Sequence, residues 1–491
     1  MTSSAIEYPF IAGVRSRGGG DGTFTSIDPS TEAPLSEVVQ SSSTQIDDAV
    51  RSAAEAQRSW IASSPDRRAQ SLWRWGELIV AAGDELATID TRDIGRPIRD
   101  TLTDPATCAR ATRYWAGMAD QIRGHQLPTV PGHLSYTVRE PLGVIAVVLP
   151  WNGPMVSMLN RVAPALACGN GVVLKPSEWS SLSAGRIAEL AVEAGIPPGL
   201  LNVTPGDGRV GAQLVGHAGV HGVSFTGSPA TGRRIAQAAA ATFKTVTLEL
   251  GGKSPNVIFA DADLDVAVDA ATWGVFANSG QVCCAGTRLL VQRGAADAVV
   301  TAIAERAAAL RVGDPLDPAT ELGPLVSASQ FERVHSYLEQ ATTDGAVIVA
   351  GGQGRMRVPK HGYFVAPTVV RGIDRTAPIG REEVFGPVLA VLEFDDEDEA
   401  VAMANDSSYG LAANVWTSDV GRMLRVCNQL EVGTVWGNSS RVMDPALPFG
   451  GFKDSGVGNA YGDGAIDGST RLKRVSIRFD ASSPMPRWPS R

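Results

Sequence analysis

Cysteine is scarce in this chain. Five of the 491 residues are cysteine, and no two of them stand in a C-x-x-C pair. The five are Cys108, Cys168, Cys283, Cys284 and Cys427. An odd and scattered set excludes a disulfide framework and lacks the spacing of a zinc site, so we expect neither. Such cysteine usage is typical of a protein of the reducing cytoplasm, which is the location that we expect.

Long apolar runs and an excess of positive charge are also missing. The longest apolar run, residues 142–150, falls far below the roughly 20 residues that span a bilayer. Residues 1–10 lack the basic and apolar pattern of a targeting signal. We therefore expect no membrane association. Lys and Arg total 43 against 52 Asp and Glu, a net charge of −9, which argues against a nucleic-acid partner.

The length of the chain points to more than one domain. Since domains cluster near roughly 100 to 200 residues, 491 residues favour two or three. A chain of this mass can bury roughly three quarters of its surface on folding. Its 53 glycines predict many tight turns between helices and strands.

The order of apolar runs predicts an α/β fold. Residues 46–122 have a mostly helical pattern. From residue 143, short apolar strands alternate with helices near 181–194, 208–217 and 229–240, which is typical of a parallel sheet covered on both faces. Sites in such sheets lie at the carboxyl ends of the strands. The strands are expected at 143–150, 171–177, 201–206, 222–228 and 245–252.

Two further regions complete the pattern. Residues 252–438 repeat the α/β texture and predict a second domain. The β-rich segments 134–140 and 471–479 flank the domains and could pair with each other as an arm that joins subunits. Fraying of a C-terminal tail is the alternative for the second segment.

Three side chains could carry chemistry. Cys283, in the small and polar segment 276–286, could be an activated thiolate, although a free cysteine is more often a core filler. Glu249 ends an apolar strand before a Gly-Gly turn and could be a general base, or an ordinary surface glutamate. Asn152 follows a strand and could donate to an oxyanion, or simply form a turn.

The segment 225–232 could bind a phosphate group. Gly227 ends a strand and Ser228 opens a helix, which places free backbone N–H groups at the helix start. The G-x-G-x-x-G spacing is absent, so an ordinary capped helix is the alternative. Lys175 could contact a phosphate or ribose, or be solvated.

Seven motifs taken together resemble one family. Their order and approximate spacing are similar to those of the aldehyde dehydrogenase superfamily, and the resemblance extends from about residue 24 to 479. The motifs are PWN at 150–152, KPSE at 175–178, FTGS at 225–228, ELGGKSP at 249–255, GQVC at 280–283, EVFGPV at 383–388 and PFGGFKDSGVG at 448–458.

The resemblance implies a domain plan and an oligomer. The fold would combine a Rossmann-like parallel-sheet cofactor domain, a second α/β catalytic domain and a small β oligomerisation arm. The implied domains are 1–122 with 142–251 for NAD binding, 252–454 for catalysis, and 123–141 with 470–491 for the arm. A homodimer or homotetramer is expected.

The resemblance also implies roles for the three side chains. Cys283 would be the nucleophile that attacks the aldehyde carbon, and Asn152 with the Cys283 backbone N–H would hold the oxyanion. Glu249 would activate the water that hydrolyses the thioester. Cys284 has no implied role, and the chemistry needs no metal.

The cofactor implied by the resemblance is NAD. Lys175 and Glu178 would meet the adenine ribose, Ser228 the pyrophosphate and Glu383 the nicotinamide ribose. A carboxylate at Glu178 would repel the 2′-phosphate of NADP, so we predict a preference for NAD. The implied cofactor contacts are Trp151, Lys175, Glu178, Gly227, Ser228, Glu383 and Phe385.

Two alternatives stay open. One is a CoA-acylating semialdehyde dehydrogenase, which the presence of Glu249 disfavours because members that release acyl-CoA lack this glutamate. The other is a non-catalytic structural or binding protein on the same fold. That alternative predicts loss of the nucleophile, base or amide, and all three are present.

The chain departs from the family pattern beside its active site. Gly153 stands where a large aromatic is usual, and Ser157 and Asn160 replace bulky apolar residues, which suggests a wider or more polar substrate tunnel unless a neighbouring loop fills it. Ala460 stands where a proton-relaying glutamate is usual, and Arg161 replaces its lysine partner. We therefore expect Glu249 to lose its proton by another route, such as ordered water, and deacylation to be slow.

Overall fold

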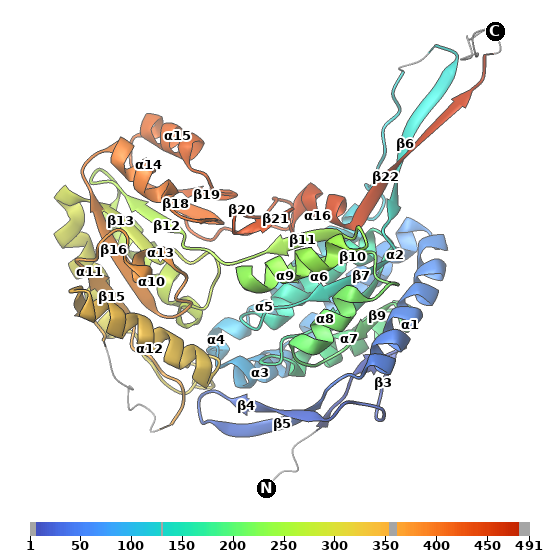
Figure 1. The fold of residues 1–491 in the computed structure, drawn as a ribbon, viewed down its shortest axis with the longest axis horizontal. Helices are drawn as coiled ribbons and strands as arrows, with labels where there is room; N and C mark the ends of the chain where they lie inside the picture. The colour runs from blue at the N-terminus through green and yellow to red at the C-terminus, as the bar shows by residue number, and fades with distance from the viewer. Residues whose placement is uncertain (1–5, 129–130, 353–360, 481–491) are drawn as a thin grey trace.

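The computed structural model describes residues 6–128, 131–352 and 361–480. Figure 1 shows two α/β lobes side by side, with a long two-stranded arm projecting from one of them. Of the helices in these ranges, none has both the length and the apolar character that a membrane crossing requires.

The chain begins with small strands and a helical segment. A three-stranded sheet has the order β1-β5-β4. Helix α1 (Ser43–Ala62) begins three residues before the expected helical region because Ser42 and Gln45 form a capping box at its start. The remaining elements are β1 (Ile6–Glu7), β4 (Thr23–Asp28), β5 (Ala33–Val39), α2 (Pro65–Ala81), α3 (Gly83–Ile94), α4 (Ile98–Thr101) and α5 (Asp104–Met118).

The first lobe contains an eight-stranded sheet with the order β21-β11-β10-β7-β8-β9-β2-β3. Its five central strands are parallel, as the apolar runs predicted, while β2 and β21 pair antiparallel with β9 and β11. The strands are β2 (Phe10–Ile11), β3 (Val14–Arg15), β7 (Val144–Val148), β8 (Gly171–Lys175), β9 (Leu201–Val203), β10 (Gly222–Thr226), β11 (Thr245–Glu249) and β21 (Gly456–Val457). The helices are α6 (Pro154–Ala167), α7 (Leu182–Glu193), α8 (Gly208–Gly216) and α9 (Pro229–Ala240).

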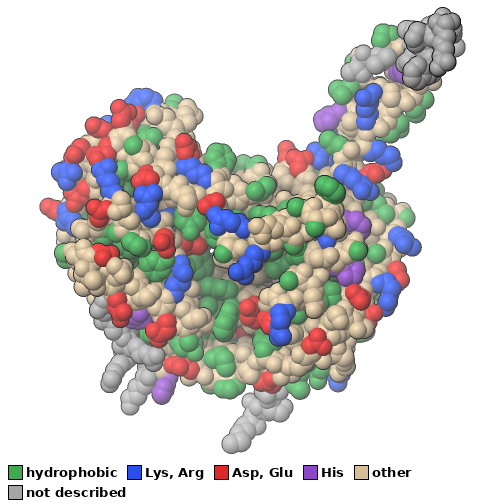
Figure 2. Space-filling model, in the orientation of Figure 1, with side chains coloured by type: hydrophobic (Ala, Val, Ile, Leu, Met, Phe, Trp, Pro, Cys, Tyr) green, Lys and Arg blue, Asp and Glu red, His purple; other side chains and the backbone are tan. Residues whose placement is uncertain are grey.

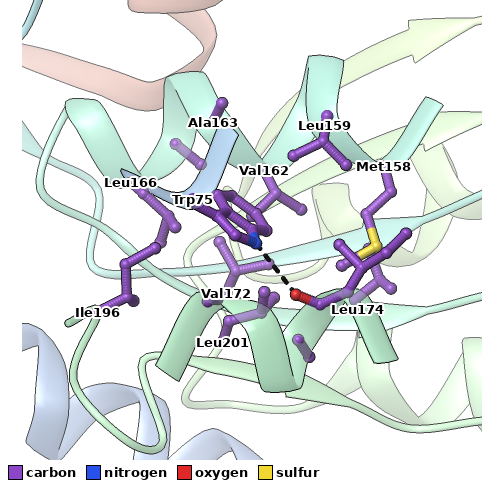
Figure 3. Packing of buried hydrophobic residues seen from close by; sticks show 14 of the residues in the cluster. Trp75, Met158, Leu159, Val162, Ala163, Leu166, Val172, Leu174, Ile196 and Leu201 are labelled. Carbon is purple, nitrogen blue, oxygen red and sulfur yellow. Dashed lines mark hydrogen bonds between the residues drawn. The ribbon is translucent and has the colours of Figure 1, made fainter. Parts of the chain in front are cut away.

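A dry core holds α6 in place beside this sheet. Figure 3 shows the Trp75 ring packed among apolar side chains of α6 and the strands, Leu159 and Val162 among them. The buried indole N–H donates to Ile187 O at 3.0 Å, so this polar atom is satisfied inside the core. Because α6 begins at Pro154, two residues after Asn152, this packing fixes the segment that carries the candidate amide.

The second lobe contains a seven-stranded sheet with the order β14-β15-β16-β13-β12-β18-β19, parallel except for β14. The α/β fold class predicted from the sequence is therefore confirmed. The strands are β12 (Pro255–Ile258), β13 (Arg288–Gln292), β14 (Val347–Ala350), β15 (Thr368–Arg371), β16 (Val388–Phe394), β18 (Ala412–Trp416) and β19 (Thr434–Gly437). The helices are α10 (Leu264–Phe276), η1 (Ala277–Gly280), η2 (Arg293–Ala295), α11 (Ala296–Ala309), α12 (Ala328–Thr343), α13 (Pro378–Arg381), α14 (Glu397–Asn405) and α15 (Val420–Gln429).

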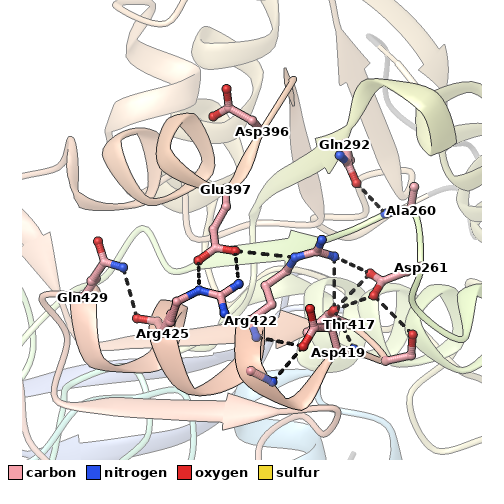
Figure 4. A network of polar contacts seen from close by, with 12 residues as sticks. Ala260, Asp261, Gln292, Asp396, Glu397, Thr417, Asp419, Arg422, Arg425 and Gln429 are labelled. Carbon is pink, nitrogen blue, oxygen red and sulfur yellow. Dashed lines mark hydrogen bonds and ion pairs between the residues drawn. The ribbon is translucent and has the colours of Figure 1, made fainter.

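A charged network joins two helices to one end of this sheet (Figure 4). Glu397, at the start of α14, accepts two hydrogen bonds from Arg425 of α15, at 2.8 and 2.7 Å. Arg422 of α15 donates to Asp261, which follows β12, at 2.8 Å. The paired N–H groups of a guanidinium match a carboxylate, so the contacts fix the orientation of α15.

The projecting arm consists of β6 (His133–Pro141) and β22 (Thr470–Arg478). The two strands pair antiparallel over nine residue pairs, from Thr470 with Pro141 to Arg478 with His133. The predicted pairing of these segments is therefore confirmed. Residues 129–130 and 481–491 of the predicted arm lie outside the described residues, and the domain boundaries remain predictions. The last elements are β17 (Tyr409–Gly410), β20 (Phe452–Lys453) and α16 (Gly462–Ser469).

Candidate active site

Four neighbouring parallel strands end beside one another and bring candidate residues together. Their order is β11-β10-β7-β8. Thr226 pairs with Glu249, and Val148 pairs with Lys175, so these strands end at matching levels. The residues expected at strand ends therefore lie along one edge of the sheet, where α/β folds place their sites. Figure 2 shows this face of the molecule hollowed between the two lobes.

The cysteine loop from the second lobe is bonded to Asn152. The Asn152 side-chain amide donates to Gln281 O at 2.8 Å, and Asn278 Nδ2 donates to Asn152 O at 2.9 Å. Gly280 has a φ of +73°, and a Cβ there would lie 2.0 Å from Gly386 O, so only glycine permits this path. One N–H of the Asn152 amide is used in this contact, and the other has no acceptor among the described residues, so it can donate to a ligand.

Cys283 and Cys284 differ in exposure and in charge environment. Cys283 is half-buried, whereas Cys284 is buried. The two thiols are hydrogen-bonded to each other, which stabilises one thiolate shared by the pair and lowers the pKa of its first ionisation. The positive charge of Arg441 contributes to this lowering. Cys283 is the more accessible of the two, so it is the better placed to meet a substrate.

Glu249 is almost fully buried and keeps both carboxyl oxygens free. Its exposure is 3%, and neither oxygen has a hydrogen-bond partner among the described residues. Burial raises its pKa to about 8, and the charge of Arg161 offsets part of that rise. A carboxyl group that has a pKa near neutral pH and no hydrogen-bond partner is suited to accept a proton.

The Gly-Gly turn after β11 lets two other segments approach closely. A Cβ on Gly251 would lie 2.3 Å from Glu383 Oε2, and one on Gly252 would lie 2.6 Å from Cys283 O. The Gly252 N–H donates to Glu383 Oε1 at 3.1 Å. Burial raises the pKa of Glu383 to about 7, and this hydrogen bond opposes the rise. Glu383 is therefore held in position beside the cysteine loop.

The remaining predicted cofactor residues offer groups that fit a dinucleotide. Lys175 Nζ donates to Glu178 Oε2 at 3.2 Å, so an ammonium donor lies next to a carboxylate acceptor. Ribose hydroxyls both accept and donate hydrogen bonds, and this pair offers one partner of each kind. Ser228 caps the start of α9 and lies exposed directly after β10, where the helix dipole favours an anion. Among the described residues, no cluster of His, Cys, Asp and Glu has the composition of a metal site.

Two aromatic rings link the lobes near these residues. Trp151 and Phe385 meet edge to face, with ring centroids 5.1 Å apart and an interplanar angle of 89°. Phe385 has a φ of +58°, and Gln330 Nε2 donates to its carbonyl oxygen at 2.8 Å, which holds the turn. Phe385 and Glu383 thus come from one fixed turn.

Several residues of the site were missed by sequence reasoning. Gln281 Oε1 accepts a hydrogen bond from Val326 N at 2.9 Å, which ties down the cysteine loop. Desolvation raises the pKa of the half-buried Tyr461, and the nearby charge of Glu249 adds to the rise. Arg441 lies close enough to Cys284 to affect its pKa. The GQVC motif pointed to Gln281, but no sequence signal marked Tyr461 or Arg441, since both depend on loop conformation.

Three of the departures from the family pattern, at Asn160, Arg161 and Ala460, line a small cavity. Arg161 Nη2 donates to Thr226 at 2.8 Å, while its Nη1 is buried without a partner in the described chain. The cavity of about 20 Å³ lies beside Arg161 and is lined by Asn160, Thr247, Asn459 and Ala460 among others. A polar cavity of this size is large enough for one water molecule. Asn160 therefore faces this cavity, whereas a Cβ on Gly153 would meet only Ser157 Oγ, at 3.9 Å.

Comparisons with known proteins agree with this geometry. The sequence model of the aldehyde dehydrogenase family matches residues 16–475. A betaine aldehyde dehydrogenase of Cereibacter sphaeroides is 44% identical over 452 residues, which cover 92% of this chain and 93% of the relative.

Solved structures give the same result. An aldehyde dehydrogenase from Burkholderia cenocepacia, described as putative, has a TM-score of 0.96 at 39% identity, covering 99% of both chains. The NAD+ complex of the Bacillus cereus aldehyde dehydrogenase has a TM-score of 0.94 at 40% identity, covering 96% of this chain and 97% of that one. The fold and the matches define an α/β oxidoreductase that acts on aldehydes. The chain belongs to the aldehyde dehydrogenase family.

Proposed function

We propose that the protein oxidises an aldehyde to its carboxylic acid with NAD, using Cys283 as nucleophile, Asn152 as oxyanion donor and Glu249 as base. The observation that carries these roles is the bond from the Asn152 amide to the backbone of the cysteine loop, at 2.8 Å. It joins the amide of the first lobe to the loop of the second lobe that carries Cys283. Glu249 adds a buried, unbonded carboxyl at the end of the adjacent sheet.

Acylation begins at the Cys283 sulfur. As the thiolate, Cys283 forms a bond to the aldehyde carbon, and the carbonyl oxygen becomes an oxyanion. The free N–H of the Asn152 amide and the Cys283 backbone N–H donate to that oxygen. NAD, when bound, supplies the acceptor for the hydride, and Cys283 is left as a thioester. Lys175, Glu178, Ser228, Glu383 and the Trp151–Phe385 pair would hold the cofactor.

Deacylation depends on Glu249. The carboxylate accepts a proton from a water molecule, the resulting hydroxide attacks the thioester carbon, and the Cys283 sulfur leaves as the acid is released. Because burial raises the pKa of Glu249 to about 8, only a minority of molecules have the basic form at pH 7. Deacylation is therefore expected to be slow at neutral pH.

The proton on Glu249 must then leave by a route that does not use position 460. Ala460 cannot relay a proton, and the arginine at 161 does not give up its own. The small cavity beside Arg161 supports an ordered water on this route.

A burst of NADH followed by a slower steady rate is expected in rapid mixing, whereas a strictly linear onset contradicts slow deacylation.

Glu178 supports a preference for NAD over NADP. Its carboxylate accepts from a ribose hydroxyl and repels a phosphate at the same position. The test compares kcat/KM for the two cofactors at saturating aldehyde, where a higher value with NADP contradicts the proposal. Glu178→Gln removes the charge and keeps the size of the side chain. It is expected to narrow the difference in kcat/KM between NAD and NADP.

The activity is tested by NADH formation across aliphatic, long-chain, aromatic, acidic and quaternary ammonium aldehydes, the last being the substrate class named for the Cereibacter relative. Cys283→Ala is the inactive control. The open wall at Gly153 predicts that bulky or functionalised aldehydes exceed acetaldehyde. Release of acyl-CoA, rather than acid, on addition of CoA would favour the acylating alternative, and no activity with any aldehyde would favour a binding protein.

The arm supports a homodimer or homotetramer, and the cytoplasm is the proposed location. Leu472, Ile477 and Phe479 are 59%, 49% and 73% exposed along β22 and just after it. Both strands of the arm are edge strands, and exposed apolar edges commonly pair with another chain. Light scattering on the purified protein tests this proposal, and a monomer at micromolar concentration contradicts it.

A further inference from the structure

Arg441 lies in the loop after β19 and stacks on the helix that leads to the cysteine loop. Its guanidinium carbon is 4.4 Å from the centroid of the Trp273 ring. Trp273 is in the last turn of α10, which continues through η1 into the loop of Cys283. The φ of Arg441 is +53°, in the left-handed region that non-glycine residues rarely adopt. The loop therefore holds this side chain over α10.

The guanidinium of Arg441 is only partly satisfied. Its Nη1 is buried and has no hydrogen-bond partner among the residues that the structure describes. The cation–π contact with Trp273 balances some of the charge, but it uses none of the N–H donors. Burying a charged donor without a partner is unfavourable, which makes this position a candidate for binding an anionic group.

The neighbouring arginines differ because each has a carboxylate. Arg110 pairs with Asp444, three residues beyond Arg441. Arg306 donates to Asp269 of α10 at 2.6 Å, and Arg99 lies 3.3 Å from Glu321. Of these charged groups, only Arg441 lacks a counter-ion in the described chain.

Arg441 also lies over the helix that leads into the loop of the reacting centre. Its positive charge contributes to the lowered pKa of Cys284, the residue next to Cys283. Trp273 lines a cavity of about 410 Å³ together with Phe276 and Ala277, the residues that lead into the cysteine loop. The three acidic residues that line it, Asp100, Asp269 and Glu321, are each already paired with Arg99 or Arg306. Arg441 is therefore the cation beside this helix that is left without a carboxylate in the described chain.

We propose that Arg441 binds a carboxylate on the aldehyde substrate, so that the enzyme prefers aldehydes bearing an acidic group a few bonds from the carbonyl. A guanidinium can donate two parallel hydrogen bonds to a carboxylate, which would satisfy Nη1 and orient the aldehyde toward Cys283. The inference rests on the proposed function. It predicts that cationic aldehydes are disfavoured, in contrast to the substrate named for the Cereibacter relative.

The test measures kcat/KM for matched aldehydes that differ in charge. The acid and neutral pairs are 4-oxobutanoate with butanal and 4-carboxybenzaldehyde with benzaldehyde, and the cationic pair is betaine aldehyde with 3,3-dimethylbutanal. In the wild-type enzyme, at least one acid is expected to exceed its neutral partner by about 10-fold or more, and betaine aldehyde to fall below its neutral partner.

Variants at position 441 test whether Arg441 causes the preference for acidic aldehydes. Arg441→Gln is expected to lower the ratio of acid to neutral kcat/KM by about 10- to 100-fold, mostly through KM, while Arg441→Lys lowers it less because the charge remains. Arg306→Gln, which removes a paired arginine beside the same helix, is the matched control and should keep the wild-type ratio. Thermal unfolding of each variant checks that it is folded.

The outcomes separate this inference from the function on which it rests. If no aldehyde of the series yields NADH, the proposed function fails. If neutral aldehydes are oxidised but neither acid is preferred, if betaine aldehyde exceeds its neutral partner, or if Arg441→Gln keeps the acid preference, the role of Arg441 is overturned and the proposed function stands.

Discussion

The two sides of the candidate site are built differently. On one side, Lys175 and Glu249 end parallel strands, and sheet register sets their positions. On the other side, residues 438–449 form a loop in which Asn438 and Arg441 have positive φ and Val442 is 60% exposed. Rigid strand ends suit the invariant steps of a reaction, while loops can change shape to select a substrate. We therefore expect substitutions at strand ends to affect chemistry and substitutions in the loop to affect selectivity.

The largest effect is expected at the proposed nucleophile, Cys283, whose loop is bonded to the Asn152 amide. Cys283→Ala should lower NADH formation by about 10⁴-fold or more, because no group remains to form the thioester. Cys284→Ala is the matched control, since it removes the adjacent thiol. Steady-state assays compare the two, and a more severe loss from Cys284→Ala would reverse the assignment.

The second-largest effect is expected from Glu249→Gln. It keeps the size of the side chain and removes the base, so turnover should fall by about 10²- to 10⁴-fold while acylation continues. Rapid mixing should then give one equivalent of NADH per active site, followed by almost no further product. Continued turnover near the wild-type rate would show that another group activates water.

Asn152→Ala removes the proposed oxyanion donor and should reduce kcat/KM by about 10²- to 10³-fold. Asn459→Ala, in the loop between β21 and α16, is the comparison and should change kcat/KM by less than about 10-fold, because Asn459 lines the small cavity beside Arg161. Equal losses from the two variants would remove the distinction between strand ends and loops.

The smallest effect is the pH dependence of deacylation. Because burial raises the pKa of Glu249 to about 8, the basic form increases as pH rises through that value. The steady rate should increase about 10-fold between pH 7 and 9, and Glu249→Gln should abolish this rise. A rate that is flat across this interval contradicts a base with a raised pKa.

The strand ends could be predicted because their sequence signals are local. Apolar runs followed by glycine or proline marked the ends of β7, β8, β10 and β11, and parallel pairing then placed Lys175 and Glu249 on one edge. The pairing of 134–140 with 471–479 followed from two unmatched β-rich segments. The roles of the predicted site residues rest on the family resemblance and remain predictions.

The contacts between the lobes could not be predicted. The bond from Asn152 to Gln281 O joins residues 129 positions apart, and the stacking of Arg441 on Trp273 depends on a loop with unusual backbone angles. Lys253 is a further case, since its ammonium group is buried without a partner in the described residues although the motif around it was recognised. Spacing along the chain contains no information on such approaches.

The most direct test of the proposed mechanism is the mass of the acylated peptide. Glu249→Gln enzyme would be mixed with NAD and an aldehyde, quenched in acid, digested and sequenced by tandem mass spectrometry. The mechanism predicts one acyl group on Cys283 and an unmodified Cys284, in an amount equal to the NADH burst. An acyl group on Cys284, or a burst of NADH without any acylated cysteine, would contradict it.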